Sequence, residues 1–229
     1  MTTAIASAEA RPRAETPAAA ADKPGLAATP TLRRREMAFG MWVFLTTETL
    51  FFGVLFFAYA AMRFAHPAAF AAASRHTDVA MGTLNTAVLL TSSVTMALAV
   101  EAAEIGRARI AARLMTATLA LGIVFLAIKG YAYHREYTEH LFPGAAFHFA
   151  GPLAGGAETF FWIYFVTTGF HALHLAIGVG VVGFMAWRLA RGGLAAQSAA
   201  SIVNAGLYWH FVDIVWIFLY PALYLVSRS

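Results

Sequence analysis

The sequence contains no cysteine and few charged residues. Without cysteine, the chain has no disulfide framework, no thiolate metal site and no covalent haem attachment. Asp, Glu, Lys and Arg make up 12% of the 229 residues, whereas 60% are hydrophobic. A soluble domain of this length needs far more charge to cover its surface, so this composition predicts that lipid covers most of it. The net charge of +4 comes from basic residues in short clusters and not from the continuous basic face typical of nucleic-acid binding, so we expect no nucleic-acid partner.

The beginning of the chain differs in character from the rest. Residues 1–31 are rich in Ala, Pro and Thr and carry scattered charges without periodicity. Such a segment cannot bury enough apolar surface to become ordered. It also has no continuous apolar run, which argues against a cleaved signal peptide. We therefore expect a disordered cytoplasmic tail, 1–31, followed by a transmembrane domain, 32–229.

Long apolar stretches follow this tail. A helix needs about 20 residues to cross the hydrocarbon layer, and each stretch is near or above that length. Helices are expected because an open strand cannot satisfy its backbone in lipid. We therefore predict an all-α membrane protein, a bundle of five transmembrane helices, in which Pro221 loosens one turn of the last helix. The stretches are about 37–62, 79–100, 110–133, 159–187 and 202–226.

The distribution of basic residues predicts the orientation of these helices. Eight arginines lie on the side of the N-terminus and four on the opposite side. This places the N-terminus in the cytoplasm and the C-terminus in the periplasm of a bacterial inner membrane. Lys129 lies near the outer end of its stretch, where its stem is expected to snorkel to the surface. Aromatic residues at the stretch ends are expected to form interfacial belts: Tyr131, Tyr133, Tyr137, Trp162, Tyr164, Tyr220 and Tyr224.

Several titratable residues fall in the middle of the stretches, where a charge is expensive and therefore suggests function. At about 1.5 Å per residue, Glu48 and Asp213 both lie roughly 16 Å from the cytoplasmic end. His210 comes one turn before Asp213, and the two share one helix face. His174 and His171 lie roughly 20 and 24 Å deep. A carboxylate at this depth must be protonated or paired, so we expect Glu48 to hydrogen-bond to a histidine of 159–187.

These residues leave several interpretations open. They can be a proton relay, a ligand set or polar residues that only join helices. A haem or metal site is disfavoured because His171 and His174 lie on a single helix, so we expect no metal ligand here. The pattern G-x-G-x-x-G at 178–183 has no preceding strand, and its glycines are expected to allow close helix approach instead. Polar residues of 79–100 are also expected to join helices: Asn85, Thr86, Thr91, Ser92, Ser93 and Thr95.

Three motifs in order give a family resemblance. The run Trp209-His-Phe-Val-Asp-Ile-Val-Trp216 closely resembles the last helix of haem-copper oxidase subunit III. The run Thr168-Gly-Phe-His-Ala-Leu-His174 is similar to its preceding helix, and Phe39 to Gly53 resembles the helix that carries the family's buried, carbodiimide-reactive glutamate. The resemblance covers about residues 36–226 and is of the five-helix bacterial form.

The resemblance implies a function that spacing alone does not. Subunit III has no catalytic centre, and haem and copper are expected in partner subunits. It packs on subunit I, in a complex with subunit II and possibly a small subunit IV, holds structural phospholipids in a cleft, and supports proton uptake. Glu48 then corresponds to the proton-handling glutamate, and Trp209, His210 and Asp213 belong to the last-helix motif. Charged residues near the helix ends become lipid-cleft candidates: Lys129, Glu136, Arg188 and Arg191.

One position departs from the family pattern. The family commonly has Lys-x-x-Glu in the third helix, but Ala132 occupies the glutamate position here, and Glu136 follows one turn later. This departure leaves open a subunit III-like accessory protein of a nitric oxide reductase. Two further alternatives are a stand-alone transporter or proton channel that uses Glu48, His171 and His174, and a membrane cytochrome b.

Overall fold

Helices account for all regular structure in the computed structural model, which describes residues 30–192 and 196–225 and contains no strand within them. Five helices are long and apolar enough to cross a membrane, as predicted. The expected tail lies outside the described residues, except that positions 30 and 31 already belong to the first helix. The long helices are α1 (Pro30–Ala65), α3 (Val79–Glu104), α4 (Ala108–Thr138), α5 (Ala154–Ala190) and α6 (Ala196–Tyr220).

Two shorter elements complete the chain. Helix α2 (Pro67–Ser74) begins with a proline in its first turn, where the missing N–H has no helical partner to lose. It packs on α5 through Phe70, whose ring centroid is 5.4 Å from that of Phe160. At the other end of the chain, α6 widens into a π-helical turn, η1 (Pro221–Leu225). This widening begins at Pro221, which confirms the expected loosening of the last helix.

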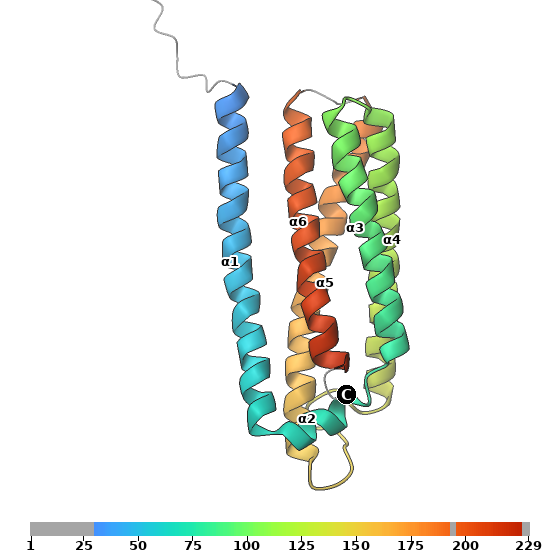
Figure 1. The fold of residues 1–229 in the computed structure, drawn as a ribbon. Helices are drawn as coiled ribbons and strands as arrows, with labels where there is room; N and C mark the ends of the chain where they lie inside the picture. Colours follow the sequence, from blue (N-terminus) through green and yellow to red (C-terminus); the bar gives the residue numbers. More distant parts are fainter. Residues whose placement is uncertain (1–29, 193–195, 226–229) are drawn as a thin grey trace, which may run out of the picture.

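The long helices run roughly parallel and antiparallel to one another, with α1 standing beside the other four (Figure 1). Helix α6 is the most enclosed of the long helices, because 56% of the residues in its 18-residue apolar segment are buried, compared with 11% in the corresponding segment of α1. Helix α1 contacts α5 and α6, and it connects to α2 at the end of the bundle where α6 finishes. Below, this end is called the C-terminal side, and the end where α1 begins is called the N-terminal side.

Close packing of α4, α5 and α6 depends on two glycines. A Cβ on Gly122 would approach the Trp209 ring to 2.8 Å, and a Cβ on Gly178 would approach the same ring to 3.3 Å. Gly178 is the first glycine of the G-x-G-x-x-G pattern. It therefore admits a neighbouring tryptophan, as the sequence predicted.

Polar side chains of α3 join this helix to its neighbours. Each bond lies within the membrane-spanning part, where such contacts contribute about 1 kcal/mol. The helix-joining role expected for these residues is confirmed for five of them, one of which is Asn85, whose Nδ2 donates to the Phe125 carbonyl of α4 over 3.5 Å. The other contacts are Trp216 Nε1 to Thr86 (3.0 Å), Trp209 Nε1 to Ser92 (3.2 Å), Ser93 to His210 (2.8 Å) and Thr95 to Thr118 (2.8 Å).

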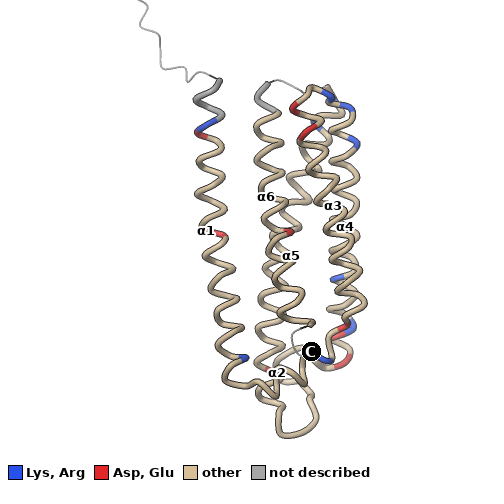
Figure 2. Tube along the Cα trace, in the orientation of Figure 1, with Lys and Arg blue, Asp and Glu red and all other residues tan. Residues whose placement is uncertain are grey.

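Charged residues gather at the two ends of the bundle, and only isolated ones remain along the middle of the helices (Figure 2). This pattern agrees with apolar helices crossing a membrane whose surfaces lie near the two ends. The isolated charges in the middle therefore define the candidate sites.

Candidate functional site

A groove runs between α1 and the facing sides of α5 and α6. Its volume is about 550 Å³, and most of its walls are apolar. Two polar contacts cross or border it: Asn204 Nδ2 donates to the Met37 carbonyl over 3.3 Å, and the Tyr208 hydroxyl donates to the His174 carbonyl over 2.9 Å. The lining residues are Met41, Phe44, Glu48, His174, Ile177, Val181, Met185, Ser201, Asn204, Ala205 and Tyr208.

Glu48 and His174 meet in the wall of this groove. Glu48 Oε2 lies 2.9 Å from His174 Nε2, which confirms the expected bond to a histidine of α5. The two side chains are 18% and 14% exposed, so they reach the groove but are mostly enclosed. The rings of Phe51 and Phe52 flank the imidazole, with centroids 6.2 and 5.2 Å away.

The hydrogen bonds of His174 require at least one proton between this residue and Glu48. His174 Nδ1 lies 2.7 Å from the Phe170 carbonyl oxygen, which can only accept, so Nδ1 carries a hydrogen. If the ring is neutral, Nε2 accepts from a protonated Glu48. If Glu48 is ionised, Nε2 donates from an imidazolium. In both states one proton lies between Glu48 and His174.

His171 faces a different environment from His174, although both lie on α5. It is 1% exposed, and neither ring nitrogen has a hydrogen-bond partner among the described residues. Its ring packs between Trp216 and Phe125, with centroids 5.0 and 5.7 Å away. His171 is therefore a buried packing residue that lies outside the groove.

His210 and Asp213 form a second polar group, between α6 and α3. His210 Nδ1 lies 3.8 Å from Asp213 Oδ2 and 2.8 Å from Ser93 Oγ. The two residues share one helix face, as predicted. Asp213 is buried, whereas the His210 side chain is 35% exposed, so this group borders the lipid-facing surface of α3 and α6.

Lys129 does not snorkel, and this expectation was wrong. It is 3% exposed and donates to the hydroxyls of Tyr164 (2.7 Å) and Tyr224 (3.0 Å). Tyr164 in turn donates to Glu136 Oε1 over 2.6 Å. Glu136 therefore joins the network of Lys129, although it lies one turn beyond the position that Ala132 occupies. These four residues, Lys129, Glu136, Tyr164 and Tyr224, are called the Lys129 cluster, and none of them lines the groove along α1.

Arg188 and Arg191 lie at the end of α5 on the N-terminal side. Their guanidinium groups lie over the rings of Phe184 and Trp187, at 5.9 and 4.4 Å from the ring centroids. Both arginines are exposed and follow Met185, a groove residue, within two turns of α5. They place positive charge at the same end of α5 as the mouth of the groove.

Asp78 closes the N-terminus of α3 on the C-terminal side of the bundle. Its Oδ1 accepts from the Met81 backbone N–H over 3.1 Å, and its Oδ2 accepts from Arg135 over 2.8 Å. The Met81 N–H, together with the Arg135 guanidinium, holds the pKa of the Asp78 carboxyl below its ordinary value. Asp78 is thus a charged helix cap at a membrane surface.

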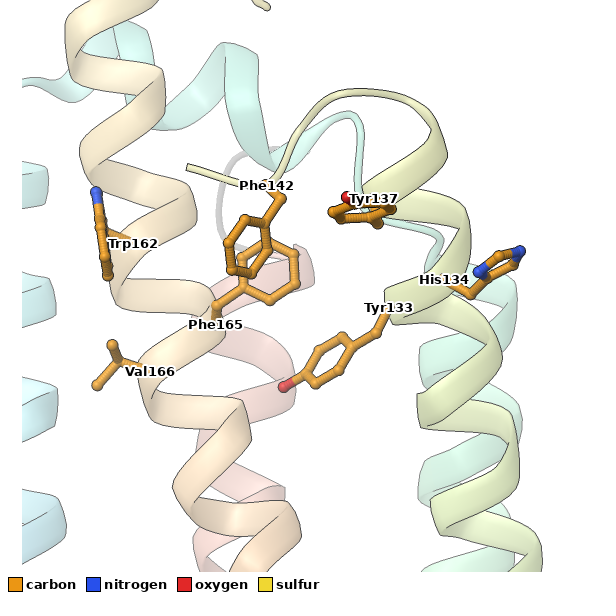
Figure 3. A pocket seen from close by; sticks show the side chains of 7 residues that line it. All are labelled: Tyr133, His134, Tyr137, Phe142, Trp162, Phe165 and Val166. Carbon is orange, nitrogen blue, oxygen red and sulfur yellow. The ribbon is translucent and has the colours of Figure 1, made fainter. Parts of the chain in front are cut away.

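A second groove, of about 520 Å³, opens between α4 and α5 on this side (Figure 3). The rings of Tyr133, Phe142 and Phe165 point toward one another there, whereas His134 points away. Tyr133 is fixed by its hydroxyl, which lies 2.6 Å from Thr168 Oγ1. This groove is lined mainly by aromatic rings, so it offers chiefly apolar contact.

Sequence reasoning missed the tyrosines of the Lys129 cluster. Tyr164 and Tyr224 were expected in an interfacial belt, but both are buried. Tyr131, Tyr137 and Trp162 are exposed, as belt residues should be. Lys129 was the available signal for these tyrosines, because an ammonium group inside the membrane requires hydrogen-bond acceptors.

Comparisons with known proteins agree with this arrangement. The sequence model of the family described as cytochrome c oxidase subunit III matches residues 27–228. Cytochrome c oxidase subunit 3 of Thermostichus vulcanus is 33% identical over 190 residues, which cover 82% of this chain and 87% of that protein. The same subunit of Gallus gallus is 32% identical over 202 residues, 86% of this chain and 71% of that protein. The haem-copper oxidase subunit I+III of Aeropyrum pernix is 33% identical over 192 residues, 81% of this chain and 22% of that protein.

Proposed function

The chain belongs to the cytochrome c oxidase subunit III family, and on this premise we propose that it is the non-catalytic subunit III of a bacterial respiratory haem-copper oxidase. The complex reduces oxygen and pumps protons, and this chain supports proton uptake. The observation that carries the proposal is the Glu48–His174 pair in the wall of the groove, which holds one proton at mid-membrane depth.

The partner subunits supply the redox centres. Haem and copper are proposed to reside in subunits I and II, and the three histidines of this chain that lie at mid-membrane depth have other surroundings. Both ring nitrogens of His174 have hydrogen-bond partners, Nδ1 of His210 contacts Ser93, and His171 is enclosed by aromatic rings. Direct packing on subunit I is supported by the Aeropyrum pernix relative, whose name joins subunits I and III in one protein. Subunit II and a small subunit IV complete the complex in the bacterial inner membrane.

The Glu48–His174 pair can take up or release a proton without large rearrangement. The carboxyl and the imidazole already share a hydrogen bond, so the proton moves between them along a 2.9 Å contact. The pair is also partly exposed to the groove, so a proton can reach it from that side. A fully enclosed pair would lack this access.

Purification of the complex with Glu48→Gln tests this role. The glutamine amide can still donate to His174 Nε2, so we expect the variant to assemble with its haem-containing partners in normal yield. The amide cannot release a proton, so we expect sustained turnover and proton uptake to decline. Glu101→Gln is the matched control, because Glu101 is an exposed carboxylate of α3 near the end of the bundle.

Three results would contradict the proposal. Failure of Glu48→Gln to assemble would make Glu48 a structural residue, and unchanged turnover would remove its proton role. Isolation of the wild-type chain as a stable, active protein without haem-containing partners would remove the subunit assignment itself.

We also propose that the groove holds a phospholipid. Its apolar walls fit acyl chains, and Arg188 and Arg191 place positive charge where a phosphate group would lie. Val181→Trp should fill the groove and reduce the phospholipid that copurifies with the complex, measured by phosphorus analysis and native mass spectrometry. Val124→Trp, on an exposed part of α4 away from the groove, is the control. Equal phospholipid content in the two variants would contradict this proposal.

A further inference from the structure

The Lys129 cluster is a fixed arrangement of donors and acceptors with few free positions. Lys129 Nζ donates two of its three hydrogens, to Tyr164 and Tyr224. The single hydrogen of Tyr164 goes to Glu136 Oε1, so the 2.9 Å contact between the two tyrosine hydroxyls is a donation from Tyr224 to Tyr164. The oxygen of Tyr164 then accepts twice, from Lys129 and Tyr224. Both tyrosine hydroxyls have donated their hydrogens, and Lys129 has one N–H left.

Two buried acceptors beside this cluster have no hydrogen-bond partner among the described residues. They are Glu136 Oε2 and Asn85 Oδ1, from side chains that are 6% and 2% exposed. The Asn85 amide cannot simply rotate to help, because its Nδ2 points at the Phe125 carbonyl, 3.5 Å away, and rotation would place two oxygens together. A buried acceptor without a partner costs about 1–3 kcal/mol, so both atoms call for a donor.

A small cavity lies next to both residues. It offers about 10 Å³ to the centre of a water molecule, which is the space of about one water. Ala132 and Gly82 form part of its wall, and a larger side chain at either position would fill it or displace Tyr224. The lining residues are Asp78, Met81, Gly82, Asn85, Ile128, Lys129, Ala132, Glu136 and Tyr224.

We propose that this cavity is a binding site for one internal water molecule. The water donates one hydrogen to Glu136 Oε2 and the other to Asn85 Oδ1, and it accepts from the remaining N–H of Lys129. These three bonds match the number that buried waters typically make. A metal cation does not fit, because the ammonium of Lys129 forms part of the same wall. The water thereby joins Asn85 of α3 to Glu136 of α4 through two acceptors that cannot bond to each other directly.

This water also extends the Lys129 cluster toward the membrane surface. Asp78 lines the same cavity and is partly exposed at the N-terminus of α3. The small side chain at position 132 leaves the space for the water, and Glu136 supplies the carboxylate from one turn further along α4. The proposal concerns the chain's own interior and stands whether or not Glu48 handles protons.

The experiment is a structure of the intact complex by electron cryo-microscopy at a resolution that shows buried waters. We expect density within hydrogen-bond distance of both Glu136 Oε2 and Asn85 Oδ1. Absence of this density, in a map that shows other buried waters, would overturn the proposal. A rotated Asn85 amide that donates directly to Glu136 would overturn it as well.

A matched pair of variants tests the consequence. Ala132→Val should exclude the water and lower the midpoint of thermal unfolding of the complex by several degrees. Ala127→Val introduces the same side chain on an exposed position of the same helix, and it should leave the midpoint unchanged. Equal midpoints for these two variants would contradict a stabilising water. If Ala132→Val does not assemble, the wild-type map alone decides the proposal.

Discussion

Replacing Lys129 by methionine removes the ammonium from the bundle interior while keeping a long side chain. The variant leaves Glu136 buried without the positive charge that Lys129 provides across the Tyr164 hydroxyl. Removing one partner of a buried charge pair costs about 3–5 kcal/mol. Lys129 is buried, so water screens little of this effect. If domains of this size lose roughly 2–4 °C per kcal/mol, the midpoint should fall by about 6–20 °C.

The informative measurement is a double-mutant cycle. Glu136→Gln alone should also destabilise the protein, because it leaves the ammonium buried without a carboxylate. In Lys129→Met with Glu136→Gln, both charges are gone, and replacing a whole buried pair is often close to neutral. We therefore expect the double variant to be more stable than the sum of the single effects predicts, by about 0.5–3 kcal/mol.

Thermal unfolding of the purified complex, with retention of this chain as the readout, measures all three variants. Arg109→Met is the control, because it removes an exposed basic residue of the same helix and should change stability by no more than about 0.5 kcal/mol. Single effects that add within about 0.5 kcal/mol would refute the coupling between Lys129 and Glu136. An unchanged midpoint in Lys129→Met would refute the importance of the ammonium itself.

Three further predictions concern packing and capping, each measured by thermal unfolding. Asp78→Ala should lower the free energy of unfolding by about 1 kcal/mol at neutral pH. Because the pKa of Asp78 is lowered in the folded state, its contribution to stability is complete above about pH 4 and is lost as the pH falls further. The stabilities of the variant and the wild type should therefore converge at low pH, and a constant difference would refute this. Gly178→Val should lower the free energy of unfolding by about 1–3 kcal/mol, because a Cβ would press on the Trp209 ring. A Cβ on Gly180 would meet nothing within 4 Å, so Gly180→Val should be less destabilising. Equal effects of the two variants would refute the close approach at Gly178. Thr95→Val should cost no more than about 1 kcal/mol, because its partner threonine on α4 also bonds its own helix; a larger loss would show a role beyond joining α3 to α4.

The helices and the Glu48 contact could be predicted from the sequence because both follow from the free-energy cost of placing polar groups in lipid. A run of apolar residues must span the membrane as a helix, and a carboxylate within it must find a partner. The depth of Glu48 on α1 and of His174 on α5 brought the two to a similar level. Spacing therefore indicated a histidine of α5 as the partner, on the condition that the two helices pack with these faces toward each other.

Which histidine faces Glu48 could not be predicted in this way. His171 and His174 are three residues apart and lie about 60° from one another around α5, so a modest rotation of the helix determines which of them faces Glu48. The choice depends on how α5 is rotated against α1, which is set by packing contacts distant in sequence. Spacing along one helix contains no information about that rotation.

The buried position of Lys129 could not be predicted from spacing along one helix either. Near the end of an apolar stretch, a lysine commonly reaches the surface, and no residue close to Lys129 in the sequence indicates another outcome. The hydroxyls that hold it come from Tyr164 and Tyr224, which are 35 and 95 positions away in the sequence. Only the folded arrangement of α4, α5 and η1 brings these acceptors to the ammonium.

The position of His171 also bears on two functions that the sequence left open. A transporter or proton channel that uses Glu48, His174 and His171 needs a proton to pass from the groove through His171 into the bundle. A relay residue must exchange hydrogen bonds with the residues before and after it. The ring of His171 packs between Phe125 and Trp216, and neither of its nitrogens has a hydrogen-bond partner among the described residues. These surroundings of His171 favour the proposed support of a partner's proton uptake over a channel that passes through this residue.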